Sequence, residues 1–470
     1  MRRVFAIAAL AMLSACAPPK APVPPDAAIA APAGWRNGAS NADAAVAIDW
    51  WKSFGDPSLA KMVETALAHN DDIAIAAARV AEARGQFRLA RAQELPNIGA
   101  DAQFARDASI NPGFGRPETQ TEGEGAIRIS YDLDLFGRLA DSSEAARAAL
   151  LASQAAQDNV RLAVAASAAS GYIALRALDA RLVVLRDTLA ARAEELRVAR
   201  RRADAGYSSL LDLTQAEAAY RATEPLIPAT LLAIARQEDG LSLLLGMSPR
   251  AIERGAAFDS LAISSAPAMV PASLLRRRPD IAVAEAQLAA SDHSLDAARD
   301  AFMPDVQLAA AGGLIGSNLA LGSPFELWSL GGSILAPIFS AGRLEAQQDI
   351  ATARRDQAAF AYRRAALNAF REVEDALVAV QRDEEQERSL SAQRDVQAHA
   401  LQLATNRYRA GYSPYLDQID AQRGLLSVQL ALVQARADRL TALVLLYQAL
   451  GGGWHQSAQA EKTAQLRVPE

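Results

Sequence analysis

The 470-residue sequence has little of several residue types and patterns that usually signal a function. Its single cysteine, Cys16, excludes a disulfide within the chain, so packing alone has to hold the fold in an oxidising compartment. No uninterrupted apolar run reaches the roughly 18 residues of a transmembrane helix, which excludes a credible helical span. The formal net charge of −6 gives no argument for nucleic-acid binding.

Residues with catalytic potential are equally sparse. The histidines are isolated in the sequence and lack the Cys/Asp/Glu spacing of a metal site: His69, His293, His399 and His455. The sequence contains no G-x-S-x-G motif, no P-loop and no dinucleotide fingerprint. We therefore expect no enzyme activity, no metal site and no dissociable cofactor.

What the chain does contain is alanine with abundant Leu, Arg, Glu and Gln, a composition typical of long helices and coiled coils. A capping box at Asp141 and the absence of proline predict a helix from 141 to about 205. Apolar residues recur along it at three/four spacing, with Arg192 in the one skipped position: Leu175, Leu178, Leu182, Leu185, Leu189 and Leu196. Asp56 and Pro57 predict a further helix from about 57 to 93.

The N-terminus is typical of a secreted bacterial protein, with a basic start, an apolar stretch at 4–13 and small residues before Cys16. "LSAC" at 13–16 resembles a lipobox, which predicts a signal peptide at 1–15 and a covalent lipid on Cys16. An ordinary signal peptide with an incidental cysteine is the alternative. Residues 17–45 read as a Pro/Ala-rich tether. Ala17 is not the aspartate that retains lipoproteins at the inner membrane, so the resemblance implies the outer membrane.

One phrase occurs twice, as "RADAGYSSLLDL" at 202–213 and "YRAGYSPYLDQI" at 408–419. Gly206 and Gly411 are 411 − 206 = 205 residues apart, and other landmarks keep almost the same distance. The chain is therefore a tandem duplication. We assign repeat 1 to 46–264, repeat 2 to 265–454 and a polar tail to 455–470.

Each repeat also contains two predicted strands. In "AIRISYDLDLF" at 126–136, apolar residues alternate without a slip with a polar set formed by Arg128, Ser130, Asp132 and Asp134. Weaker strand patterns lie at about 98–106, 305–313 and 327–338, and loops rich in Gly, Pro and Asn separate the pairs.

Four amphipathic strands pose a physical problem, since an open sheet in a membrane leaves two edges unsatisfied and only a closed barrel removes them. Single-chain barrels begin at about eight strands, so copies of this chain have to close the barrel together. The polar set at 128–134 then faces the lumen. Strands that cap a soluble helical body are the alternative.

The repeated phrase lies where each long helix turns back, with return helices predicted at about 211–245 and 416–450. Glycine permits the left-handed residue that ends a helix, and Ser208 or Ser413 can cap the next one. A plain hairpin turn accounts for Gly and Ser but not for the Leu-Asp that follows both times.

These features together resemble the outer-membrane efflux proteins typified by TolC and OprM, in the lipoprotein branch called the NodT type. The resemblance runs from about residue 46 to 454. "DWWKSFGDPSL", "RRRPDIAVAEAQL" at 276–288, "AFMPDVQLAAAGG" at 301–313 and the two hairpin phrases carry it. The family usually has a glycine where Asp296 stands, which leaves the local packing open.

The resemblance implies a mainly α fold with a β-barrel part. Three chains would form one 12-stranded barrel in the outer membrane and a periplasmic tunnel of long helices. The hairpin tips would dock a periplasmic adaptor, a membrane fusion protein, and an inner-membrane pump of the RND type would supply the substrate. The tip residues are Gly206, Tyr207, Ser208, Leu211, Asp212, Gly411, Tyr412 and Ser413.

At the second tip the resemblance implies a closed entrance, with a constriction at Leu416 and Asp420 and with Asp417 as a further candidate. In a trimer each becomes a ring of three, and clustered carboxylates attract cations. Arg407 and Arg409 can pair with a neighbour's acid and hold the entrance shut. The alternative is a solvated helix face near a turn. Gln215 occupies the position equivalent to Asp420 in repeat 1.

The resemblance thus implies an outer-membrane exit duct that conducts small molecules such as drugs or metal ions, and no enzyme. Two other functions stay open at this point: export of a protein or polysaccharide through the same kind of duct, and a lipid-anchored periplasmic coiled-coil adaptor. The clean alternation at 127–135 speaks against an adaptor, which needs no lipid-facing strands.

Overall fold

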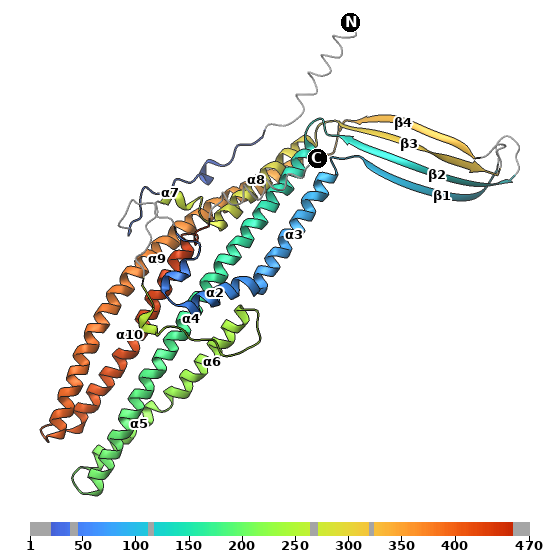
Figure 1. The fold of residues 1–470 in the computed structure, drawn as a ribbon. Helices are drawn as coiled ribbons and strands as arrows, with labels where there is room; N and C mark the ends of the chain where they lie inside the picture. The colour runs from blue at the N-terminus through green and yellow to red at the C-terminus, as the bar shows by residue number, and fades with distance from the viewer. Residues whose placement is uncertain (1–19, 38–45, 111–116, 264–270, 319–323, 455–470) are drawn as a thin grey trace. The chain divides into compact units, whose positions relative to one another are not determined.

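The computed structural model describes residues 20–37, 46–110, 117–263, 271–318 and 324–454. Over these residues the chain is mainly helical and contains one four-stranded sheet (Figure 1). The predicted signal peptide at 1–15, Cys16 and the tail at 455–470 lie outside the described residues. Within the described ranges, none of the helices combines the length and the apolar character that a membrane span needs.

The described elements form the same series twice. The N-terminal part and the first series consist of η1 (Pro25–Ala27), η2 (Trp50–Phe54), α2 (Pro57–His69), α3 (Asp71–Ala92), β1 (Asn97–Ile110), β2 (Pro117–Leu133), α4 (Arg138–Asp204), α5 (Leu210–Thr223), α6 (Leu226–Leu244) and η3 (Phe258–Ser260). The second consists of α7 (Pro271–Leu274), α8 (Pro279–Asp300), β3 (Asp305–Ser317), β4 (Phe325–Leu335), α9 (Arg343–Arg409) and α10 (Tyr415–Ala449). Each series thus has a helix, two strands and a long helical hairpin, as the repeat predicts.

The chain divides into two compact units, and each draws on both repeats. Unit 1 contains the chain up to Ala28, Ala78–Gln154 and Val283–Arg364, which include the sheet. Unit 2 contains Ile29–Ala77, Ala155–Ala282 and the chain from Ala365 onward, which include both hairpin turns. The predicted repeat boundaries therefore describe the sequence and not these units.

Two predicted helices are broken by capping residues. The helix expected at 57–93 divides at Asn70, whose side-chain oxygen accepts from the backbone N–H groups of Asp72 and Ile73 while its amide donates to the carbonyl of Leu244. The return helix expected at 211–245 divides between α5 and α6 at Pro225, because proline cannot donate a helical hydrogen bond.

The start of α4 also differs from the prediction. The helix begins at Arg138, so Asp141 lies inside its first turn and does not cap it. Asp134 provides the cap, because its Oδ2 accepts from the N–H of Ala140 at 2.8 Å. Asp134 follows the last residue of β2, so the predicted lumen-facing row ends at Asp132.

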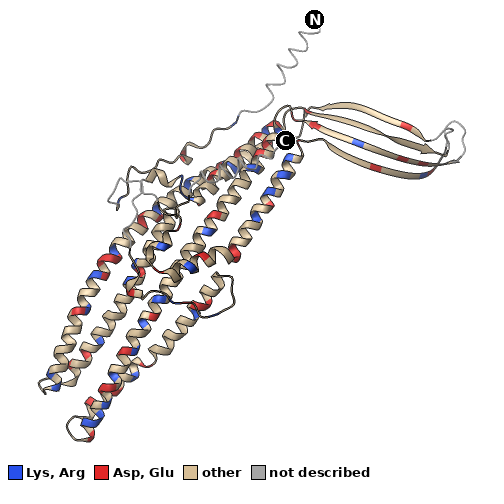
Figure 2. Ribbon diagram, viewed as in Figure 1, with Lys and Arg blue, Asp and Glu red and all other residues tan. Residues whose placement is uncertain are grey.

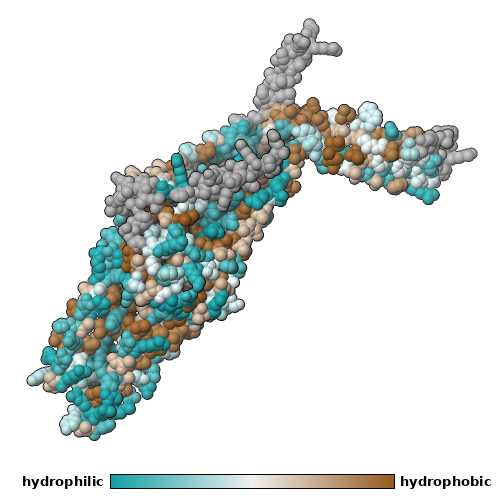
Figure 3. Space-filling view, viewed as in Figure 1, coloured by the Kyte–Doolittle hydropathy of each residue, from teal (hydrophilic) through white to brown (hydrophobic). Residues whose placement is uncertain are grey.

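The sheet has the strand order β1-β2-β3-β4, and every neighbouring pair is antiparallel. In the register, Arg128 of β2 lies opposite Gly99 of β1 and Ala311 of β3. The opposite face contains exposed apolar side chains on all four strands, among them Phe104, Ile127, Leu314, Trp328 and Leu330. Figure 3 shows hydrophobic surface over the sheet. One face is therefore apolar and the other largely polar, as the alternation predicts.

β1, β2 and β3 are longer than the sequence pattern suggested, and β4 is not. β2 extends back to Pro117 and β1 extends to Ile110, into the segment that was predicted to be loop. β4 ends at Leu335, earlier than the predicted 338. Polar and glycine residues form these extensions of β1 and β2. They can do so because pairing between the two backbones holds this end of the hairpin together and requires no alternation of apolar side chains.

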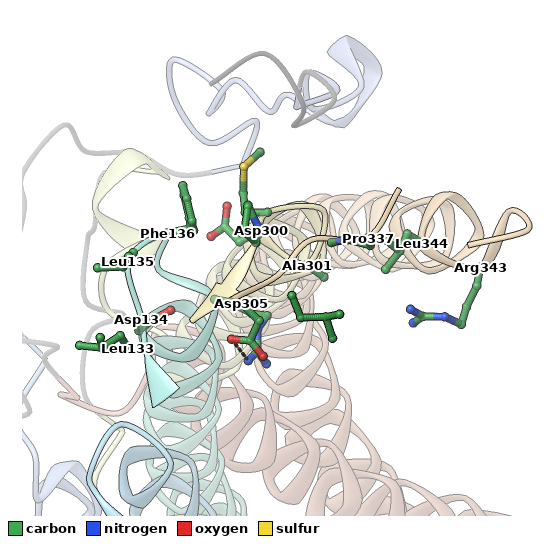
Figure 4. Close-up of a pocket in the computed structure, with 14 residues that line it drawn as sticks. Leu133, Asp134, Leu135, Phe136, Asp300, Ala301, Asp305, Pro337, Arg343 and Leu344 are labelled. Carbon is green, nitrogen blue, oxygen red and sulfur yellow. Dashed lines mark ion pairs between the residues drawn. The ribbon is translucent and has the colours of Figure 1, made fainter. Parts of the chain in front are cut away.

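A pocket of about 380 Å³ lies within unit 1 where the strands give way to the helices. Leu133 and Phe136 line it from the end of β2, Asp300 ends α8, and Asp305 begins β3 (Figure 4). The carboxylate of Asp305 pairs with Arg138 at 3.6 Å, which joins the first residue of β3 to the first residue of α4.

Candidate entrance at the hairpin tips

The two hairpin turns have the same backbone structure. Gly206 and Gly411 have φ of 76° and 79°, the left-handed conformation that ends a helix at low cost only with glycine. The N–H of Tyr207 donates to the carbonyl of Arg202 at 2.8 Å, and the N–H of Tyr412 donates to that of Arg407 at 2.9 Å. The repeated phrase is thus a Schellman turn used twice.

The serines that follow do not act as predicted. Ser209, and not Ser208, caps α5, because its Oγ accepts from the N–H of Asp212 at 3.1 Å. In the second tip the N-cap is Pro414, which makes no side-chain cap, and the hydroxyls of Ser208 and Ser413 are buried without a partner among the described residues. At the first tip the capping serine is thus one residue later than predicted.

Other tip side chains are free to meet a partner. Tyr207, Leu210, Leu211 and Tyr412 are all strongly exposed. Asp212 is only half-buried, and its N–H is used in the cap of α5. The predicted docking role of these residues stays a prediction, and their exposure satisfies its first requirement.

A small core joins the two hairpins just behind their tips. Ala199 of α4 and Ala216 of α5 pack with Tyr415 and Ile419 of α10, and Leu196, Leu213 and Tyr408 lie partly buried around them. The rings of Tyr408 and Tyr415 lie 5.0 Å apart, and the guanidinium of Arg202 lies over the Tyr408 ring at 5.4 Å. Burial raises the pKa of the Tyr415 hydroxyl, so the phenol stays neutral there.

A polar contact lies next to this core and links α4 to α10. Gln418 donates to the carboxylate of Glu195 at 2.8 Å, and Gln422 donates to both oxygens of Glu195 at 2.5 Å. Gln418 is only 3% exposed and Glu195 is half-buried. We call this set of three residues the Glu195 interlock. Charge-assisted hydrogen bonds of this kind are shorter and stronger than neutral ones.

Arg192 lies one turn before Glu195 and is 5% exposed. Its guanidinium donates to the carbonyl of Ala219 at 2.8 Å and to the hydroxyl of Thr223, so it joins α4 to α5. Burial lowers the pKa of this guanidinium below its ordinary value, and the nearby Glu195 opposes that effect. The charge of Glu195 therefore favours the charged form of the buried Arg192.

The interlock was missed because the two repeats differ at its positions. With the offset of 205, Glu195 corresponds to Ala400 and Gln418 corresponds to Leu213, so neither copy repeats the motif. One signal was available: Arg192 stands in the single skipped position of an otherwise apolar seam. A charge at a seam position indicates a buried polar partner, but the sequence does not say which one.

The predicted constriction residues lie on the exposed side of α10. Leu416, Asp417 and Asp420 are all exposed, and Asp420 pairs with Arg423 of its own helix at 3.5 Å. Such an exposed pair contributes little stability.

The two arginines of the second tip are equally open. Arg407 and Arg409 are exposed on the last turn of α9, and neither forms an ion pair with the part of this chain that the structure describes. This placement leaves both side chains open to a neighbouring subunit, as the gate prediction requires.

The predicted lumen residues lie on the polar face of the sheet. Arg128 pairs with Asp101 at 2.7 Å and with Glu124 at 2.9 Å. Asp132 accepts from the side-chain amide of Gln307 at 3.0 Å, and Ser130 lies exposed between them in the same row. These cross-strand contacts connect β1, β2 and β3 on one face, which fits a water-facing surface.

A sequence profile described as "Outer membrane efflux protein" matches residues 62–247 and 270–452 of this chain. The two matched segments correspond to the two repeats and cover most of the sequence. The chain belongs to the outer membrane efflux protein family.

Individual relatives agree with this assignment. The chain is 34% identical to the "Probable efflux pump outer membrane protein TtgC" of Pseudomonas putida, over 95% of this chain and 94% of the relative. It is 32% identical to the "Cation efflux system protein CusC" of Escherichia coli, over 87% and 88%. The solved structure of the outer-membrane channel OprN resembles it with a TM-score of 0.86 at 29% identity, over 93% of this chain and 99% of that one.

Membership of this family decides between the alternatives that the sequence left open. The strands belong to an outer-membrane channel fold and do not cap a soluble body, so the predicted fold class is confirmed. The chain is an outer-membrane protein and not a periplasmic adaptor. The family consists of passive efflux channels and not of enzymes.

Among the residues that the structure describes, one grouping has metal-ligating atoms close together: Asp141, His293 and Asp296 of unit 1. His293 already pairs with Asp141 at 3.0 Å, and the two oxygens of Asp296 accept from Arg299 and Lys20. Each of the three side chains thus has a hydrogen-bond or ion-pair partner within the chain. We therefore assign them a structural role, which is to hold α4, α8 and the N-terminal segment together.

Proposed function

We propose that the protein is the exit duct of a tripartite efflux system and that it works as a homotrimer. One observation carries the proposal: the chain combines two long helical hairpins with a four-stranded sheet that is apolar on one face and largely polar on the other. The outer strands β1 and β4 each have one edge without a partner among the described strands. Three chains would close the sheet with 3 × 4 = 12 strands and remove every free edge.

The polar face then lines a lumen wide enough for water, since barrels of about this size exceed the eight strands that side chains can fill. Arg128, Ser130 and Asp132 belong to this lining. The long helices α4 and α9 carry many acidic and basic residues (Figure 2), which suits a tunnel through an aqueous compartment.

We place the closed entrance at the hairpin tips. Leu416 and Asp420 form the constriction, Asp417 adds to its negative charge, and Arg407 and Arg409 pair across subunits. Rings of carboxylates favour cations over anions at a pore entrance. The exposed tips, Gly206 to Asp212 and Gly411 to Ser413, dock a periplasmic adaptor, and an inner-membrane pump of the RND type delivers the cargo.

The N-terminus adds a second membrane attachment through a lipid on Cys16, which is the one covalent group that we propose. The cargo is a class of small molecules or ions, for which the relative named as a cation efflux protein gives one example. A duct of this kind needs no specific binding site for its cargo, because the pump selects it.

The native mass of the protein, extracted from membranes in mild detergent, tests this proposal first. We expect a mass of three chains, and we expect the same sample to conduct ions in planar bilayers. A monomer that conducts no ions contradicts the proposal, because four strands cannot close a barrel. The sample is the full-length chain, so no isolated domain is needed as a control.

A further inference from the structure

Within unit 1, the first described residues of the chain contact α8 and α9, which are far from them in sequence. The ammonium of Lys20 contacts Asp292 at 3.0 Å and Asp296 at 2.7 Å, both on α8. These are partly exposed ion pairs, each weak alone, but two carboxylates on successive helical turns hold one ammonium between them.

Arg355 of α9 holds the next residues in a different way. Its side chain is 1% exposed, and its two terminal nitrogens donate to the backbone carbonyls of Ala21 at 2.8 Å and Pro22 at 3.1 Å. Its Nε donates to Asp356 at 2.9 Å. A buried guanidinium is costly unless all its donors are used, and here the N-terminal segment supplies two of the acceptors.

The segment itself is prepared for docking. Prolines at 22, 24 and 25 restrict its backbone, so little conformational entropy is lost when it binds. It ends in η1, where Ala27 is only 6% exposed although its neighbour Asp26 is exposed.

We propose that Asp292, Asp296 and Arg355 form a docking site for the chain's own residues 20–28, and that this site determines where Cys16 can reach. The four peptide units between Cys16 and Lys20 span at most about 14 Å when fully extended. A docked Lys20 therefore sets an upper limit of about that length on the distance from Lys20 to Cys16.

The position of the site matters for the membrane. Asp296 lies four residues before the end of α8, a rise of about 6 Å, and α8 ends at Asp300 beside the pocket where β3 begins. The site thus holds Lys20 about one to two helical turns from the strand–helix junction. Because the sheet is proposed to span the membrane, the docked segment brings the lipid-bearing residue to the same membrane surface; this consequence rests on the proposed function, whereas the docking does not.

Cysteine labelling tests the docking directly. In a Cys16→Ser background the chain has no other cysteine, so Ala27→Cys becomes a single reporter whose reaction with a maleimide is slow only while the segment is docked. Asp26→Cys, on the adjacent exposed residue, gives the rate of an undocked thiol. We expect Ala27→Cys to react at least about tenfold more slowly than Asp26→Cys, since both differ chiefly in exposure.

Variants of the site then identify its parts. Lys20→Glu and Arg355→Ala should each speed the labelling of Ala27→Cys by about fivefold to tenfold, whereas the exposed substitution Arg354→Ala, on the neighbouring residue, should leave it unchanged. Combining Lys20→Glu with Asp296→Lys should slow the reaction again, because the swap restores an ion pair without restoring the original residues.

Two results would overturn the proposal. One is fast labelling of Ala27→Cys in the parent, at the rate of Asp26→Cys. The other is slow labelling that neither Lys20→Glu nor Arg355→Ala changes, which means that the named residues do not hold the segment. The native mass of each sample reports the proposed trimer separately, so a failure of the docking site and a failure of the channel are distinguishable.

Discussion

The Glu195 interlock makes a quantitative prediction about the entrance. Replacing Glu195 by Ala removes the acceptor of the Gln418 amide and of the Gln422 amide, which together join α4 to α10. If the tips separate when the channel opens, this contact exists only in the closed state. The substitution should then shift the population toward the open state without touching the constriction itself.

The size of the shift follows from the contacts. A hydrogen bond to a charged group contributes about 1.5–3 kcal/mol, and because Glu195 is half-buried we take the lower value for the whole contact. About 1.4 kcal/mol is a factor of ten in an equilibrium constant. Each subunit should therefore favour opening about tenfold more, and three subunits that open together should reach about a thousandfold.

Single-channel recording in planar bilayers measures this shift as the fraction of time spent open. Glu194→Ala is the matched control, because Glu194 is the neighbouring acid, is exposed and pairs with Arg197 of its own helix. Glu195→Gln should give an intermediate result, since it keeps one acceptor oxygen but loses the charge. If Glu195→Ala and Glu194→Ala conduct alike, the interlock has no part in closing the entrance.

Three further predictions concern other parts of the chain. Asp420→Ala should raise the single-channel conductance, because the smaller side chain widens the proposed constriction and removes the contact of Asp420 with Arg423; an unchanged conductance would remove Asp420 from the constriction. Cys16→Ser should abolish incorporation of radiolabelled palmitate, and persistent labelling would show that another residue carries the lipid. Burial and then the neighbouring Asp141 raise the pKa of Asp300 from 3.8 to about 6, so its stabilising contribution is complete below about pH 4 and is lost as the pH rises through 6. Asp300→Asn should therefore raise the melting temperature slightly at pH 8 and not at pH 4, and an equal effect at both values would rule out the titration of Asp300 as the cause.

Much of the fold could be read from the sequence because its signals are local. Alternation at 127–133 predicted β2, since side chains of a strand point to opposite faces in turn. The two glycines at 206 and 411 predicted both turns, because the left-handed conformation is a property of a single residue. The seam around Leu175, Leu182 and Leu185 is buried, as the three/four spacing indicated.

The local errors have local causes as well. Asn70 and Pro225 each interrupt a segment whose composition favours one continuous helix. Asn70 provides a side-chain cap for a new helix, and Pro225 lacks the backbone N–H that would continue the first one. The cap of α4 was assigned to Asp141 from a sequence motif, but Asp134 reaches the free N–H of Ala140 from outside the helix. Several residues near a helix start can accept the same hydrogen bond, and only the path of the chain selects one.

The sequence by itself determined the duplication, the two periodicities, the hairpin turns and the family, because each depends on residues that are near one another in the chain or repeat along it. The tertiary structure decided which polar groups meet. Glu195 finds Gln418, and Arg355 finds the carbonyls of Ala21 and Pro22, across intervals of 223 and more than 330 residues. Such contacts leave no periodic trace, because burying a charge requires a partner in space and sets no condition on its distance in sequence.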